Sequence, residues 1–207
     1  MTDLPPPVIP DSGPRRRLPS GTLSGIVGLL AATALLWVLE GVDYVLPGDM
    51  DSLGIVPRDV DGLPGIALAP FLHAGFDHLA ANTVPLLVLG FLAALRGPGR
   101  FVLATVIIVL VSGIGVWLTS PPLTVTVGAS GVVFGYFGYV LGRGLFDRRL
   151  LDIAVAAVVL FVYGSIVWGV LPGQAGISWQ AHLFGLVGGV LAAWVLRGPR
   201  KAPVNMS

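Results

Sequence analysis

Four polar residues of the kinds used in acyl transfer occur in an otherwise very apolar chain: Ser130, His182, His78 and Asn82. A serine hydroxyl becomes a nucleophile when a neighbouring neutral imidazole takes its proton, which histidine does near neutral pH. The attacked carbonyl becomes an oxyanion that needs aimed donors, and His78, Asn82 and the backbone N–H of Ser130 are donors of that kind. The set therefore indicates attack on a carbonyl group by a Ser130–His182 pair.

The composition indicates a membrane environment for this chemistry. Of the 207 residues, 55% are hydrophobic and only 11% are charged, and the mean hydropathy is +0.88, which is too apolar for an ordinary soluble domain. The net charge of +1 gives no support for a nucleic-acid partner. The absence of cysteine excludes disulfides, a cysteine nucleophile and thiolate metal sites.

Six apolar segments approach the roughly 20 residues that a helix needs to cross a bilayer. We therefore predict an all-α membrane protein, a bundle of six transmembrane helices. The first segment has no convincing cleavage site after it, so we interpret it as a retained anchor. The predicted spans are residues 23–39, 78–95, 101–118, 130–141, 151–171 and 177–196.

Basic residues concentrate in alternate connections, which predicts the orientation. They occur before the first span, after the second and fourth, and after the sixth, whereas the other connections hold one arginine, Arg58, among several aspartates. Because basic loops stay on the cytoplasmic side, both termini should be cytoplasmic. We expect an integral protein of a bacterial plasma membrane, with its lipid bilayer as one partner.

The candidate catalytic residues should lie at one depth, near the outer surface. His78 and Asn82 are four residues apart, hence on one helical face. His182 lies about five residues into its span, roughly 8 Å deep. From Gly128 to Arg143 a helix reaches only about 22 Å, so Ser130 should begin below the outer surface, in a recess that opens outward.

Small residues should let the fourth and sixth spans approach closely. Along the fourth span, glycines recur every three or four residues from Gly131 onward. In the sixth span, Gly185 and Gly189 lie on the same face as His182. Small-xxx-small patterns permit close helix packing. Gly128, like Gly131, leaves room for a substrate backbone at the start of the helix.

Three motifs together resemble those of the rhomboid proteases: His73-x4-His78-x3-Asn82, Gly128-Ala-Ser130-Gly131, and Ala-His182-x2-Gly185-x3-Gly189. They occur in the family order over the second to sixth spans. The resemblance implies Ser130 as nucleophile, His182 as base with no third acidic member, His78 and Asn82 at the oxyanion, and His73 in support. It also implies transmembrane protein substrates, small residues at the cleaved bond, and no cofactor.

Two positions depart from the family pattern. Many relatives carry a tyrosine four residues after the serine, stacked on the histidine, where this chain has Phe134. A phenyl ring keeps the stacking surface and loses the hydroxyl. The Trp-Arg pair that is frequent in the first outer loop is also missing, and the region offers only Pro57-Arg58, so the anchoring of this loop is open.

Each polar residue also has a structural interpretation, because single serines, histidines and asparagines commonly join membrane helices. For His73 in particular, we prefer a structural role to a direct catalytic one. The chain contains no His-Glu-x-x-His motif, which argues against a zinc protease, and no Gly-x-Gly-Asp motif, which argues against an aspartyl protease. Its three histidines have no carboxylate beside them inside the spans and make a poor metal site, so we predict no metal. A transporter or channel is disfavoured because the polar residues cluster at one depth. The alternative function is a weak or inactive rhomboid-like protein that binds membrane helices.

The predicted organisation is a disordered cytoplasmic tail over 1–20, a protease domain over 21–197 and a cytoplasmic tail over 198–207. The longest connection, residues 40–76, should lie outside and dip into the interface or cap the site.

Overall fold

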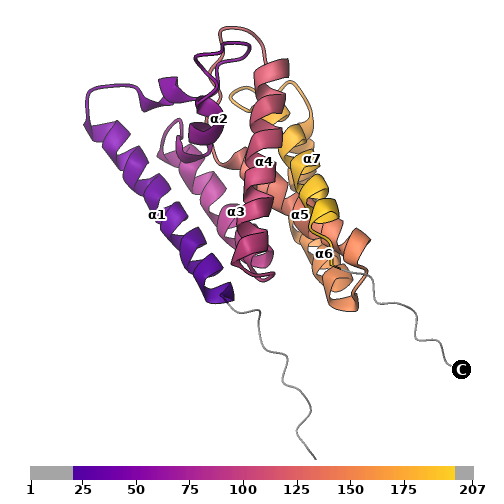
Figure 1. Cartoon of the computed structure of the whole chain (residues 1–207). Helices are drawn as coiled ribbons and strands as arrows, with labels where there is room; N and C mark the ends of the chain where they lie inside the picture. Colours follow the sequence, from indigo (N-terminus) through magenta and orange to yellow (C-terminus); the bar gives the residue numbers. More distant parts are fainter. Residues whose placement is uncertain (1–20, 199–207) are drawn as a thin grey trace, which may run out of the picture.

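The computed structural model describes residues 21–198, which form a bundle of helices without a β-strand (Figure 1). The predicted all-helical class is confirmed. The predicted tails over 1–20 and 198–207 lie outside the described residues, apart from Gly198. The six longest helices are α1 (Thr22–Val45), α3 (Phe76–Ala94), α4 (Pro98–Thr119), α5 (Ser130–Asp147), α6 (Leu150–Tyr163) and α7 (Trp179–Val195).

Four helical segments in the described part of the chain are long and apolar enough to cross a membrane: α1, α3, α4, and α6 together with the 3-10 helix η3 (Gly164–Val170). Helix α7 is apolar but shorter. Helix α5 is surrounded by α3, α4, α6 and α7, so its side chains face protein and need not be apolar. Its tyrosines, glycines and two charged residues lower its hydropathy. Apolar length therefore identifies four spans, and the predicted count of six stays a prediction.

The long connection between α1 and α3 folds into three short helical pieces, η1 (Met50–Leu53), α2 (Gly65–Leu68) and η2 (Ala69–Phe71). Ile55 and Ile66 are buried in it. Ile55 exchanges two backbone hydrogen bonds of 3.0 Å with Thr126, just before α5. The connection is thereby fastened to the segment that leads into α5.

Arg58 anchors the same connection to the end of α4. Its backbone N–H donates to the Trp117 carbonyl at 3.0 Å, and its guanidinium donates to the Leu118 carbonyl. The Trp117 indole N–H donates in return to the Asp59 carbonyl at 2.8 Å. Arg58 thus holds this loop with a tryptophan from α4, a partner that the sequence pattern did not suggest.

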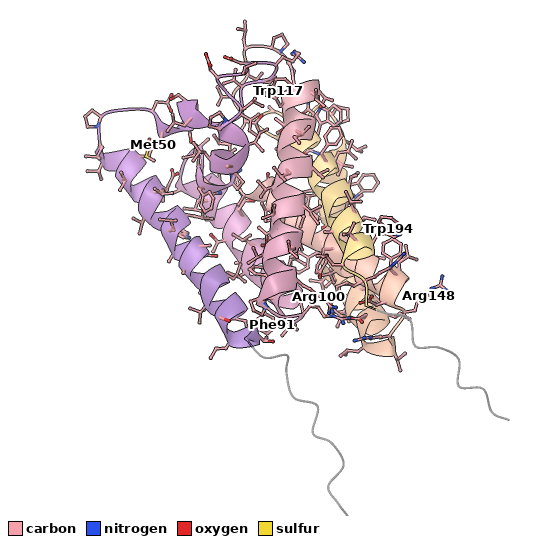
Figure 2. The ribbon with its side chains drawn as sticks, viewed as in Figure 1. Met50, Phe91, Arg100, Trp117, Arg148 and Trp194 are labelled. Atoms are coloured by element: carbon pink, nitrogen blue, oxygen red, sulfur yellow. The ribbon has the colours of Figure 1, made fainter. Side chains whose placement is uncertain are left out.

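Charged side chains around the buried Asp152 join the opposite end of the bundle. Asp152, at the start of α6, pairs with Arg96 and, at 2.6 Å, with Arg143 of α5. Arg96 also pairs with Asp147 at 3.0 Å. Figure 2 shows Arg100 and Arg148 at this same end, far from Trp117. The cluster therefore ties α6 to the ends of α3 and α5.

Replacing Asp152 with asparagine should destabilise the fold strongly. Two partly buried guanidinium groups would lose the buried carboxylate that they share, and removing one partner of a buried pair typically costs about 3–5 kcal/mol. Unfolding in mixed micelles with increasing SDS would measure the loss. Asp61→Asn, at an exposed site in the loop, is the control and should change little. Equal stability of the two variants would contradict the role given to this cluster.

Candidate active site

Ser130 is the first residue of α5, and the backbone before it is held from two sides. Gly128 has a φ of +117°, a conformation that favours glycine. Its N–H donates to the Ala69 carbonyl at 2.9 Å, and the N–H of Ala129 donates to His73 Nε2 at 3.2 Å. Among the described residues the N–H of Ser130 has no acceptor. It is therefore a free donor at a helix N-terminus, where negative charge is stabilised.

His73 and His78 flank this turn. Their rings meet edge to face, with centroids 5.3 Å apart. A Cβ at position 128 would lie 2.7 Å from His78 Cε1, so the glycine also leaves room for His78. His73 is fully buried and acts on the backbone of the turn, whereas His78 is half-buried beside it.

Asn82 lies one helical turn after His78 on α3. Its Nδ2 donates to the His78 carbonyl at 3.0 Å, and its side chain is buried. One amide hydrogen is thus used within the helix, which leaves the second hydrogen of the Nδ2 group for another acceptor.

His182 lies in the first turn of α7, which begins at Trp179, two residues later than predicted. Ser178 caps the helix by accepting a hydrogen bond from the Ala181 N–H. The Phe134 ring stacks on the imidazole, with centroids 4.0 Å apart and planes 9° apart. Because Phe134 is four residues after Ser130, the imidazole lies over the face of α5 that starts at Ser130. No Ser130–His182 hydrogen bond is present in the described part of the chain.

Glycines let α7 lie directly against α5. A Cβ at Gly185 would overlap the Gly131 carbonyl, and one at Gly189 would overlap the Gly135 carbonyl. This spacing brings the first turn of α7, with His182, next to the first turn of α5, with Ser130.

Comparison with known proteins gives this arrangement a family. The rhomboid domain family matches residues 63–199, which is most of the chain. The chain belongs to the rhomboid family. It is accordingly an integral membrane protein, as its apolar helices indicate.

Relatives of this rhomboid protein include proteins from mycobacteria and from Bacillus. An uncharacterised protein of Mycobacterium tuberculosis (strain ATCC 25618 / H37Rv) is 48% identical over 181 residues, covering 84% of this chain and 75% of that protein. One from Mycobacterium leprae (strain TN) is 42% identical, covering 93% and 78%. Rhomboid protease GluP of Bacillus subtilis (strain 168) is 31% identical, covering 62% of this chain and 25% of GluP.

Two contacts at the rhomboid site involve residues that the sequence analysis did not select. Ser112 of α4 donates to the Ala181 carbonyl at 2.9 Å. The Gly169 carbonyl lies 2.9 Å from His182 Nδ1. Ser112 is a buried hydroxyl within an apolar span, a recognisable signal. Gly169 acts through its backbone and gives no such signal.

A small cavity of about 20 Å³ lies beside Gly128 and Gly131, enough for about one water molecule. Ser112 and Thr126 supply its polar lining, and Ile66 and Val109 belong to its apolar lining. It places space for water next to the start of α5.

Burial and, to a smaller extent, the neighbouring His78 together lower the pKa of His73 to about 4. The neutral ring is the form that accepts from the Ala129 N–H, so protonation would break that hydrogen bond.

The unfolding free energy of the rhomboid protein should therefore fall on acidification. Unfolded His73 takes up a proton below its ordinary pKa of 6.5, whereas the folded residue stays neutral down to about 4. The stabilisation is complete above pH 6.5, and about 3 kcal/mol of it should be lost near pH 4. Unfolding in detergent between pH 7 and pH 4 would measure this. The control His73→Gln keeps an acceptor and should lose this part of the pH dependence; an identical pH dependence in both proteins would contradict it.

Proposed function

We propose that this rhomboid protein is an intramembrane serine endopeptidase that cleaves transmembrane segments of other proteins through Ser130 and His182. One observation carries the proposal: His182 is held over the Ser130 face of α5, stacked on Phe134, with Nδ1 against the Gly169 carbonyl. A carbonyl only accepts, so the neutral ring carries its proton on Nδ1. Nε2 is then the base.

The reaction uses the groups around the start of α5. The Ser130 hydroxyl attacks the scissile carbonyl carbon while its proton passes to His182 Nε2. The oxyanion is stabilised by the Ser130 N–H and by the side chains of His78 and Asn82. The protonated His182 then gives its proton to the leaving amine, and the acyl-enzyme forms. A water molecule, deprotonated by His182, hydrolyses the ester and restores Ser130.

The proposed membrane arrangement has six spans, α1, α3, α4, α5, α6 with η3, and α7. Arginines gather at the end of the bundle where α1 starts and α7 ends, and Arg100 and Arg148 lie there in Figure 2. By the positive-inside rule this end is cytoplasmic, so the site opens to the outside. Helix α5, with 18 residues, is about 27 Å long, against about 33 Å for the 22 residues of α4. This difference supports a recessed Ser130.

The substrates we propose are transmembrane helices that unwind readily near their outer end. In a lipid environment the peptide bonds of a helix are hydrogen-bonded within it, so their carbonyls are shielded until the helix opens. Small residues at the cleaved bond are part of this proposal because the resemblance of the three sequence motifs to those of the rhomboid proteases implies them.

A fluorophosphonate probe tests the proposal directly, because it reacts with activated serines. The detergent-purified protein should be labelled, and mass spectrometry should place the adduct on Ser130. Absence of labelling in a folded protein, with the probe shown to reach the recess, would instead favour a helix-binding protein without protease activity.

Asn82→Ala should slow labelling by about 10²- to 10³-fold, the usual effect of losing one oxyanion donor. The rate constant for probe labelling, followed over time, measures it. The neighbouring Thr83→Val is the control, because Thr83 accepts a hydrogen bond from the indole of Trp37 on α1, away from the site. An unchanged rate in Asn82→Ala would remove Asn82 from the oxyanion site.

A further inference from the structure

Helix α6 is held firmly at one end and loosely along its length. Among its residues only Asp152 and Val159 are buried, and Asp152 forms the ion pairs described above. The opposite end continues as η3, in which no residue is buried. The contact that this end makes with α7 is therefore its main tie to the site.

In α7, η3 contacts His182, the proposed catalytic base. The Gly169 carbonyl lies 2.9 Å from His182 Nδ1. A Cβ on residue 169 would lie 2.9 Å from Phe134 Cζ and 3.0 Å from His182 Nδ1. Residue 169 thus offers an acceptor to the imidazole, and its missing side chain leaves room for the Phe134–His182 stack.

Each of these features has a chemical consequence. An acceptor at Nδ1 selects the neutral tautomer with the proton on Nδ1, and this leaves the Nε2 lone pair for the Ser130 proton. The stack restricts rotation of the ring about its long axis. An imidazole whose tautomer and orientation are both fixed needs no rearrangement before it takes the Ser130 proton.

We propose that Gly169 is a positioning residue that sets the tautomer and orientation of His182, so that the outer end of α6 controls the base. The proposal rests on the protease function proposed above. Displacement of η3 away from α7 removes the acceptor from Nδ1, and Ser130 is then no longer activated. The base is complete only while this end of α6 lies against α7.

Nitrogen-15 NMR of the histidine-labelled protein in detergent micelles tests the positioning role without relying on activity. The chain has three histidines, so His182→Gln assigns the His182 signals. At neutral pH the wild type should show a protonated Nδ1 and an unprotonated Nε2 at His182. In Gly169→Ala the two tautomers should mix, and the probe-labelling rate should fall by roughly 10²-fold, as expected for a misplacement near 1 Å.

Gly164→Ala is the matched control, because it lies in the same 3-10 helix and its Cβ would meet Leu160 Cδ1 at an ordinary 3.6 Å. It should keep the wild-type tautomer and rate. A wild-type His182 with its proton on Nε2 would overturn the proposal, even if Gly169→Ala failed to fold. So would a folded Gly169→Ala with unchanged tautomer and rate. An unlabelled wild type with the Nδ1–H tautomer would refute the protease function and leave the positioning of His182 supported.

Discussion

Ser130→Ala is expected to abolish labelling by the fluorophosphonate probe, and His182→Ala to reduce its rate on the order of 10⁶-fold, the loss typical of removing the nucleophile or the base of such a site. The double variant lacks the serine oxygen and should therefore behave like Ser130→Ala, without labelling. The measurement is the labelling rate of purified protein, followed by cleavage of a reconstituted transmembrane substrate.

Ser165→Ala is the matched control for the nucleophile. Ser165 lies in η3 and is exposed, so the variant should label at the wild-type rate on Ser130. Circular dichroism and SDS-titration midpoints should be the same for all the variants. Labelling that persists in Ser130→Ala would place the reactive serine elsewhere and overturn the proposed dyad.

Gly185→Ala is expected to lower both stability and the labelling rate. The new methyl group would overlap the Gly131 carbonyl, so α7 must move away from the first turn of α5. Overpacking of this kind typically costs about 1–3 kcal/mol. A shift near 1 Å between His182 and Ser130 should lower the labelling rate by about 10²-fold. SDS titration and the labelling rate measure the two effects.

The control for this prediction is Gly28→Ala on α1. A Cβ at Gly28 meets nothing within 4 Å, and alanine is favoured over glycine in helices. This variant should be as stable as the wild type, or more so, with normal labelling. A Gly185→Ala protein that matches it in both measurements would show that α5 and α7 tolerate separation.

Much of the fold could be predicted from the sequence because the signals are local. Apolar runs correspond to the observed helices within a few residues at most ends; for instance, residues 78–95 are observed as Phe76–Ala94 and residues 101–118 as Pro98–Thr119. Two helices continue well past the end of their apolar run. Helix α1 continues to Val45 and α5 to Asp147, because helical hydrogen bonding goes on after the apolar run stops.

The fifth predicted span was less regular than its apolar pattern indicated. Residues 151–171 were predicted as one span, and α6 ends at Tyr163 before η3 begins at Gly164. Hydropathy measures transfer into lipid and carries no information about which helical hydrogen-bonding pattern the backbone adopts. Yet this change of helix type determines where the Gly169 carbonyl lies.

The candidate site, too, could be predicted only in part from the sequence. The residue types and spacings of His78, Asn82, Ser130 and His182 indicated a hydrolytic set from the sequence alone, because chemistry depends on side-chain type and short helical spacings place residues on one face. The outer connection was predicted to dip into the interface or cap the site, and its Ala69 carbonyl accepts a hydrogen bond from the Gly128 N–H in the turn before Ser130.

Contacts between segments far apart in the chain were decided only by the tertiary structure. The Ala129–His73 hydrogen bond, the Trp117–Asp59 anchor and the Gly169–His182 contact each depend on a backbone group. Every residue other than proline carries the same backbone groups, so the sequence cannot distinguish the ones that a fold uses. By itself, the sequence determined the chemical groups, the apolar segments and the glycines that allow close approach; the packing of α5, α6 and α7 decided which of those groups meet.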